Sequence, residues 1–173
     1  MGKNKALLII DMLNDFVKKG APLYVPNIES IIDPIKREIE YARTNDIKII
    51  YICDAHGKED REFTLYPPHA IKNTKGSEII KALKPGKDDI IIKKKTFSGF
   101  YNTSLDDVLK KLKITELIIT GCVVNICVLF TVADAVLRGY KVNVIRDAVI
   151  GLNKKDYDFS LKQMKNILKV NIV

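Results

Sequence analysis

Residues 6–10 read ALLII and run directly into an aspartate, Asp11. The run is apolar at every position rather than alternating with polar residues, which is typical of a strand buried on both faces of a parallel sheet. Runs of the same kind, rich in isoleucine and valine, recur along the chain. They predict strands at 6–10, 47–53, 90–93, 116–120 and 141–146, with 170–173 as a candidate sixth strand.

Segments with helical periodicity separate these strands. Isoleucines that follow Asn27, an expected N-cap, recur at intervals of three and four residues towards Ala42. A long apolar segment from Asn125 to Leu137 stops at Gly139, a typical C-terminal signal. Strands that alternate with helices form right-handed crossovers and a parallel sheet. We therefore predict one α/β domain over residues 1–173, a three-layer doubly wound sheet, mostly or wholly parallel with helices on both faces. The expected helices span 28–42, 76–83, 103–112, 125–137 and 156–168.

The composition argues against several classes of protein. The 173 residues carry a formal net charge of +8, but the lysines are scattered and only the run at 93–95 is dense. Without a basic stripe interleaved with aromatic residues, we expect no nucleic-acid partner. The apolar runs are too short to span a bilayer, and the first residues lack a signal-peptide cleavage pattern. Three cysteines without framework spacing fit a reducing cytoplasm, which is the expected location.

Three polar residues of complementary chemistry follow predicted strands. Asp11, Lys94 and Cys127 each come after an apolar run, and in an open α/β sheet the carboxyl ends of the strands line the crevice that binds ligands. A carboxylate, an ammonium and a thiol in one crevice can serve as base, cationic stabiliser and nucleophile. At the start of the predicted helix 125–137, Cys127 is expected to have its thiolate favoured by free backbone amides and by Lys94. Cys53 and Cys122 fit small buried hydrophobic residues.

A second group of residues suggests a metal site. Asp54 and His56 follow the strand 47–53, and His69 comes later in the same long loop, so both histidines of the chain lie there. One carboxylate and two imidazoles can occupy one face of an octahedral ion and leave positions for water and substrate. Zn²⁺, Fe²⁺ and Mn²⁺ are all compatible with this set. The alternative is that the histidines are solvated loop residues.

Taken together, these motifs resemble the isochorismatase-like cysteine hydrolases, and within them the nicotinamidase branch. The resemblance covers nearly the whole chain. It is carried by ALLIIDMLNDFV, CDAH, YPPHA followed by GSE, KKTFSGFYNTSL, and GCVVNICVLFTVADAVLRGYKVNVIRDA. It implies the fold of that family, a thiol-dependent hydrolase, and a homo-oligomer, since relatives are commonly dimers or larger.

The resemblance also implies roles for individual residues. Asp11, Lys94 and Cys127 match the catalytic triad of the family, with Lys95 as the alternative lysine. A cis peptide is expected at Val123–Val124, and the backbone amides of Val124 and Cys127 are expected to form the oxyanion hole.

The metal ligands and the substrate contacts of the nicotinamidases map onto this chain in the same way. Asp54, His56 and His69 match the residues that hold a divalent ion, which in that branch binds the pyridine nitrogen. Phe16 and Tyr66 match aromatic residues beside the substrate ring.

Some positions depart from the nicotinamidase pattern. Val124 and Asn125 stand where threonine and aspartate are usual, Leu13 replaces a polar residue, and Ala70 replaces a common cysteine. These departures bear on the choice of substrate more than on the chemistry.

The expected function is hydrolysis of nicotinamide to nicotinate and ammonia through a thioester, with a small-molecule amide as substrate. One alternative is another small amide, ureide or carbamoyl compound in the same superfamily. A remote alternative from another class is a non-catalytic α/β module that binds a ligand or nucleic acid.

Overall fold

A single parallel sheet forms the centre of the molecule. The computed structural model describes residues 2–173. All neighbouring strands pair in parallel, in the order β3-β2-β1-β4-β5-β6. This confirms the predicted α/β fold with a wholly parallel sheet. The strands are β1 (Lys5–Ile10), β2 (Lys48–Asp54), β3 (Ile90–Lys94), β4 (Glu116–Cys122), β5 (Lys141–Ile150) and β6 (Asn171–Ile172).

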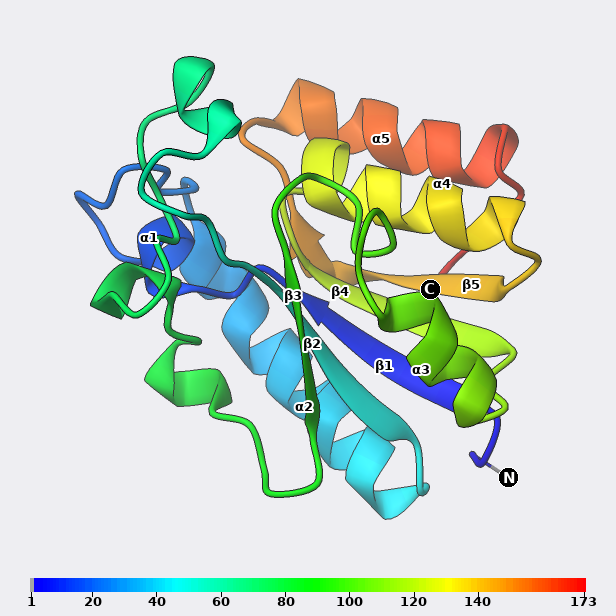
Figure 1. Cartoon of the computed structure of the whole chain (residues 1–173). Helices are drawn as coiled ribbons and strands as arrows, with labels where there is room; N and C mark the ends of the chain where they lie inside the picture. The colour runs from blue at the N-terminus through cyan, green and yellow to red at the C-terminus, as the bar shows by residue number, and fades with distance from the viewer. Residues whose placement is uncertain (1) are drawn as a thin grey trace.

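Helices cover both faces of this sheet, which gives three layers (Figure 1). Side chains of α3, α4 and α5 pack with one face, and those of α1 and α2 pack with the other. A π-helical turn, Val124–Val128, leads into α4. The helices are α1 (Asn14–Val17), α2 (Ile32–Thr44), α3 (Leu105–Lys111), α4 (Leu129–Leu137) and α5 (Lys154–Asn166).

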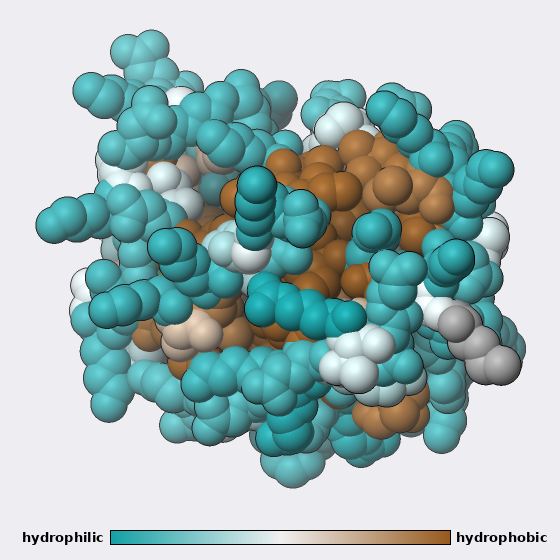
Figure 2. Space-filling model, turned by 90° about the horizontal axis from the view of Figure 1, so that it is seen from below, coloured by the Kyte–Doolittle hydropathy of each residue, from teal (hydrophilic) through white to brown (hydrophobic). Residues whose placement is uncertain are grey.

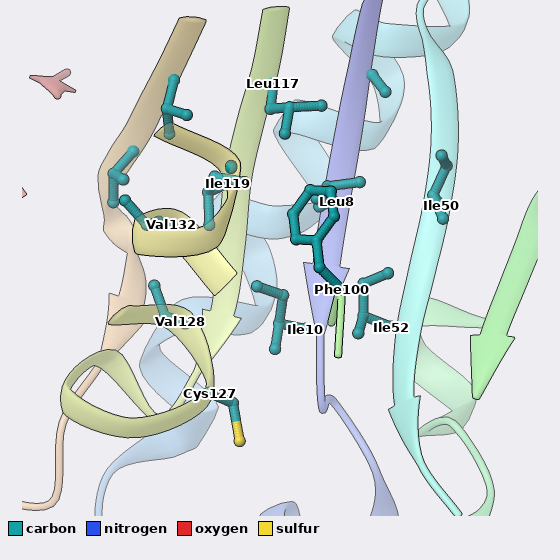
Figure 3. Close-up of a cluster of buried hydrophobic side chains, with 14 of the residues drawn as sticks. Leu8, Ile10, Ile50, Ile52, Phe100, Leu117, Ile119, Cys127, Val128 and Val132 are labelled. Atoms are coloured by element: carbon teal, nitrogen blue, oxygen red, sulfur yellow. The ribbon is translucent and has the colours of Figure 1, made fainter. Parts of the chain in front are cut away.

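The central strands are apolar throughout because each face has its own hydrophobic core. Leu8 and Ile10 of β1 point to the same cluster as Val128 and Val132 of the helical layer, with Cys127 at the end of that cluster nearest the strand ends (Figure 3). Leu7 and Ile9 of β1 belong to the core on the α2 side. Burial on both faces explains why residues 6–10 form an unbroken apolar run.

Two local predictions were wrong. Residues 76–83 do not form one helix but two separate 3₁₀ turns, Lys75–Ser77 and Lys81–Leu83. The backbone between them pairs with the segment after β1 instead: the Glu78 carbonyl accepts from Asn14 N at 3.0 Å, and Ile80 N donates to the Met12 carbonyl at 3.0 Å.

The second error concerns the start of the helix after the first loop. Asn27 makes no side-chain cap; its backbone has φ 61°, and a 3₁₀ turn, Ile28–Ile31, precedes α2. A left-handed residue reverses the chain here, a conformation that asparagine tolerates well.

Polar side chains cover most of the face seen from below, with apolar surface between them (Figure 2). In the part of the chain that the structure describes, no helix is both long and apolar enough to cross a membrane.

Candidate active site

The site lies where the sheet changes its direction of winding. The chain leaves β1 towards α1 and α2 on one face, whereas it leaves β4 towards α4 on the other. Between two such strands the connections diverge and open a crevice at the carboxyl ends. Asp11 directly follows β1, Cys127 lies in the turn after β4, and Asp54 and Lys94 are the last residues of β2 and β3.

The backbone at this crevice is held in unusual conformations. Asp11 has φ 52°, and its Oδ1 accepts a hydrogen bond from Asp54 N at 2.8 Å. Gly121 has φ 108°, and a Cβ there would lie 2.1 Å from the Ile10 carbonyl oxygen. Only glycine permits so close an approach of β4 to β1 with that φ angle. Strained backbone of this kind is typical of functional sites.

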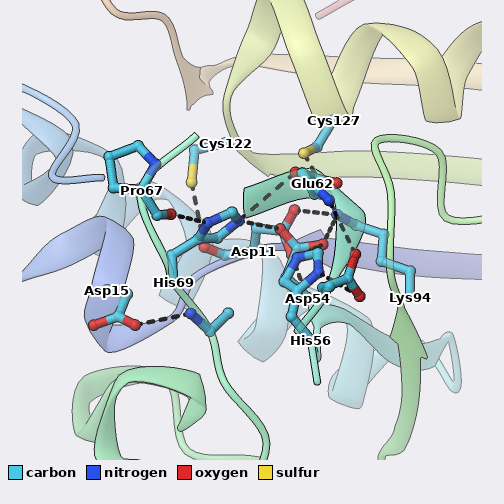
Figure 4. Close-up of polar contacts among 12 residues, drawn as sticks. Asp11, Asp15, Asp54, His56, Glu62, Pro67, His69, Lys94, Cys122 and Cys127 are labelled. Carbon is cyan, nitrogen blue, oxygen red and sulfur yellow. Dashed lines mark hydrogen bonds and ion pairs between the residues drawn. The ribbon is translucent and has the colours of Figure 1, made fainter. Parts of the chain in front are cut away.

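Lys94 joins the two strand-end carboxylates to the thiol (Figure 4). Its Nζ lies 2.7 Å from Asp11 Oδ2, 2.5 Å from Asp54 Oδ1 and 3.4 Å from Cys127 Sγ. All four side chains are buried, whereas Lys95 is exposed. A carboxylate oxygen of each aspartate and the Cys127 sulfur all lie within 4.8 Å of one another. The structure therefore brings together the three predicted catalytic residues, with Lys94 and not Lys95 in the crevice.

The two aspartates of this cluster differ in acidity. Burial and the nearby charge of Asp54 raise the pKa of Asp11 to about 6, against the opposing effect of Lys94. Burial alone raises the pKa of Asp54 as well, but the charge of Lys94 and the neighbouring histidine rings outweigh burial and hold it far below its usual range. Lys94 itself keeps its proton, because the carboxylates raise its pKa despite burial. Asp11 is thus the carboxylate that can exchange a proton.

The expectation of a low thiol pKa was wrong for the protein without ligands. Burial raises the pKa of Cys127 well above its usual value and outweighs the charge of Lys94, while the aspartates add to the increase. The thiol therefore keeps its proton at rest and needs a base beside it.

The predicted metal ligands also converge. A ligand atom from each of Asp54, His56 and His69 lies within 4.8 Å of the other two. His69 Nε2 is 3.7 Å from Asp54 Oδ2, and His56 Nε2 is 3.8 Å from Asp54 Oδ1. His69 Nδ1 donates to the Pro67 carbonyl at 2.8 Å, which leaves Nε2 as a free electron-pair donor.

These residues fit a divalent ion. Both ring nitrogens of His56 are buried without a hydrogen-bond partner among the described residues. Buried polar atoms are normally satisfied, so an unpartnered imidazole beside a carboxylate and a second imidazole indicates a missing ligand. The donor set of one oxygen and two nitrogens suits Zn²⁺, Fe²⁺ or Mn²⁺.

The sequence analysis missed two acidic residues of the loop after β2. Asp60 Oδ2 lies 3.3 Å from His56 Nδ1, and Glu62 Oε1 lies 3.7 Å from His69 Nε2. Their only sequence signal is position within the loop that holds both histidines. Asp60 thus lies beside the nitrogen of His56 that faces away from Asp54, and Glu62 lies beside the same Nε2 of His69 that faces Asp54. Both add negative charge beside the candidate metal ligands.

A cavity of about 240 Å³ opens beside Cys127. Both predicted aromatic contacts, Phe16 and Tyr66, line it, as do Asp54 and His69. Its wall also contains Phe97, Ile126 and Leu152, among other residues that sequence reasoning did not single out.

Comparison with known proteins identifies the family. A model of the isochorismatase domain matches residues 5–172. The chain belongs to the isochorismatase family of hydrolases. It is 35% identical over 176 residues to a protein of Arabidopsis thaliana described as a probable inactive nicotinamidase, covering 95% of this chain and 90% of that one. It is 31% identical over 188 residues to the nicotinamidase of Escherichia coli, covering 89% of this chain and 86% of the relative.

Solved structures of the isochorismatase family share this fold. The pyrazinamidase of Pyrococcus horikoshii in complex with zinc matches with a TM-score of 0.92 and 29% identity, over 98% of each chain. A zinc-bound relative and the cluster of Asp54, His56 and His69 together favour a divalent metal in this chain.

The turn after β4 corrects one detail taken from the family resemblance. The non-proline cis peptide joins Cys122 and Val123, one residue earlier than expected. The Val123 carbonyl then accepts hydrogen bonds from the amides of Ile126 and Val128. Val124 and Cys127 stay in the first turn, where backbone amides are available to a ligand.

Proposed function

We propose that this isochorismatase-family chain is a cysteine amidohydrolase that hydrolyses nicotinamide to nicotinate and ammonia. The observation that carries the proposal is the set of contacts around Lys94 Nζ, which hold Asp11 and Cys127 together beside a cavity walled by aromatic side chains. In this proposal a flat aromatic ring occupies the cavity that Phe16, Tyr66 and Phe97 line, with its amide towards the buried sulfur.

In the proposed first half-reaction Asp11 takes the thiol proton as Cys127 Sγ attacks the amide carbon. The carbonyl oxygen becomes negatively charged and is stabilised by the backbone amides of Val124 and Cys127. The carbon–nitrogen bond then breaks, the nitrogen takes the proton from Asp11, and ammonia leaves a thioester on Cys127.

In the second half-reaction Asp11 removes a proton from water, which attacks the thioester carbon. The carbon–sulfur bond breaks, Asp11 gives its proton to the sulfur and so restores the thiol, and the product acid loses its remaining proton and leaves as nicotinate. Lys94 stays protonated throughout and balances the buried carboxylates, so that Asp11 can alternate between base and acid.

Asp54, His56 and His69 are proposed to hold one divalent ion at the cavity wall. When bound, this ion would act as a Lewis acid that anchors the ring nitrogen of the substrate. The histidines contribute by keeping their Nε2 atoms turned towards Asp54, and the Pro67 carbonyl holds the ring of His69 through Nδ1.

Ammonia release from a panel of small amides tests the proposal. The panel contains nicotinamide, pyrazinamide, a carbamoyl amino acid and an aliphatic amide. It distinguishes the nicotinamidase hypothesis from the alternative, in which the substrate is another small amide, ureide or carbamoyl compound. Because one relative is described as probably inactive, turnover itself is the first measurement. An inert protein, with added Zn²⁺, Fe²⁺ or Mn²⁺ each tried, would refute the enzymatic proposal.

A matched pair of cysteine variants tests the nucleophile. Cys127→Ala should abolish turnover, whereas Cys122→Ala, which removes an equally buried thiol that contacts the Asp11 carbonyl, should retain most of it. Equal losses in both variants would contradict the assignment. The single domain, the cytoplasmic location and the homo-oligomer remain predictions from the sequence.

A further inference from the structure

The dense run of lysines contains two that the proposed chemistry does not use. Side chains alternate between the faces of a strand, so burial of Lys94 places its neighbours Lys93 and Lys95 on the opposite side. Both are exposed. Lys93 is the second-last residue of β3 and Lys95 is the residue after that strand, at an open edge of the sheet.

These lysines border a second cavity, separate from the one beside Cys127. It has a volume of about 230 Å³. No carboxylate-bearing side chain lines it. Its lining consists of Ala55, Lys72, Lys93, Lys94, Lys95, Thr96, Tyr101 and Asn102.

Apart from Lys94, the lysines of this cavity form no ion pair among the described residues. Among residues 2–173, no carboxylate lies within 4.0 Å of the ammonium groups of Lys72, Lys93 or Lys95. Lys72, Lys93 and Lys95 all line this one small hollow, and like charges gathered there create a local positive potential. A concave site of one charge sign raises the local concentration of ions of the opposite sign.

We propose that this cavity binds a diphosphate-bearing anion. Lysine recognises phosphate as a point charge, and three lysines match the charge of a diphosphate better than that of a single phosphate. Thr96 and Asn102 supply uncharged hydrogen-bond donors at the same wall. The ring of Tyr101 is 60% exposed at the rim, where a nucleobase could stack. The diphosphate can therefore be free or part of a nucleotide.

Calorimetric titration of the purified protein with inorganic pyrophosphate tests the proposal. We expect binding with a Kd of about 1 mM or tighter at low salt. The variant Lys72→Met/Lys93→Met should weaken binding at least about tenfold. Its control is Lys18→Met/Lys19→Met, which removes the same charge from exposed positions outside the cavity and should bind like the wild type. Both double variants keep all three proposed metal ligands, so any pyrophosphate held by a bound ion contributes equally.

A second arm distinguishes the two sources of diphosphate. Adenosine diphosphate that binds more tightly than pyrophosphate, with the gain lost in Tyr101→Ala, indicates a nucleotide. Equal affinities indicate the free inorganic anion, and either result supports the site. The absence of binding by the wild type, or equal weakening in both double variants, would overturn it.

Discussion

Charged residues at the two ends of the sheet differ in their exposure to solvent. At the carboxyl end, Asp11, Asp54 and Lys94 are removed almost entirely from solvent. At the amino end, Glu116 is the centre of a cluster that stays in contact with water, with Lys5 33% and Lys141 68% exposed.

The amino-end cluster is also better satisfied. Glu116 accepts from Lys5 at 3.1 Å, from Lys141 at 3.3 Å and from Asn143 at 2.7 Å. Asn143 in turn accepts from Asn171 at 3.0 Å, so this network joins the ends of four strands. At the carboxyl end, by contrast, both nitrogens of His56 lack hydrogen-bond partners among the described residues.

This contrast distinguishes residues that stabilise the fold from residues to which we assign a role in catalysis. A hydrogen-bonded, partly exposed carboxylate such as Glu116 contributes to stability and has little reason to react. A buried carboxylate with a raised pKa, beside a protonated thiol and the unpartnered imidazole of His56, costs stability but can move a proton. Matched substitutions, one at the carboxyl end of the sheet and one at the amino end, test this distinction.

The largest expected difference is in catalysis. Asp11→Asn keeps the shape of the side chain but removes the proton acceptor, so kcat should fall by roughly 10³-fold or more. Glu116→Gln makes the same change at the amino end and should leave kcat within about twofold of the wild type. Steady-state ammonia release measures both, and an active Asp11→Asn enzyme would exclude this residue as the base.

The next largest effect is on stability. Lys94→Met leaves two buried carboxylates without their cation and should lower the free energy of unfolding by about 3–5 kcal/mol. Lys141→Met removes a partner from an ion pair that is open to solvent, and should cost less than about 1 kcal/mol. Urea denaturation of chelator-treated protein compares the two. Similar losses would show that burial does not distinguish the two ends.

A pair of glycines tests the backbone at each end. Gly121→Ala and Gly139→Ala share the penalty for a side chain at positive φ, roughly 1–2 kcal/mol. Only at Gly121 does the new Cβ meet backbone, whereas at Gly139 nothing lies within 4 Å. Gly121→Ala should therefore lose a further 1–3 kcal/mol, roughly, in urea denaturation. An equal loss at both positions would contradict the close approach of β4 to β1.

The smallest effect is a dependence of stability on pH at the amino end. Burial is the largest single effect on the pKa of Glu116 and raises it, but the hydrogen bonds from Lys5, Asn143 and Lys141 together outweigh burial and lower the pKa below 4.5. A carboxylate with a lowered folded-state pKa stabilises the protein above its unfolded-state pKa and loses this contribution as the pH falls through the folded-state value. The difference in unfolding free energy between wild type and Glu116→Gln should therefore be larger at neutral pH than in acid. A constant difference would mean that the charge of Glu116 does not contribute.

Much of the architecture could be predicted from the sequence because its signals are local. Apolar runs such as 116–120 mark strands buried on both faces, and the residues that follow them fall at one end of a parallel sheet. These two signals predict that Asp11, Lys94 and Cys127 lie together.

The remaining features depend on contacts between distant segments. The backbone of 76–83 forms no continuous helix because its groups pair with the residues after β1. Glu62 and Phe97 reach the site only through the path of their loops. The raised pKa of Cys127 follows from complete burial, which helix position alone did not predict.

The strand order has a consequence for how the protein is made. β1 pairs on one side with β2 and on the other with β4, so Lys5 lies opposite Glu116. During synthesis β1 leaves the ribosome long before β4 has been made. The edge of β1 that pairs with β4 therefore stays without hydrogen-bond partners until then. Such edges are prone to aggregation, so we expect nascent chains that stop before residue 116 to depend on chaperones. Cys127 can then reach Asp11 only after that delay.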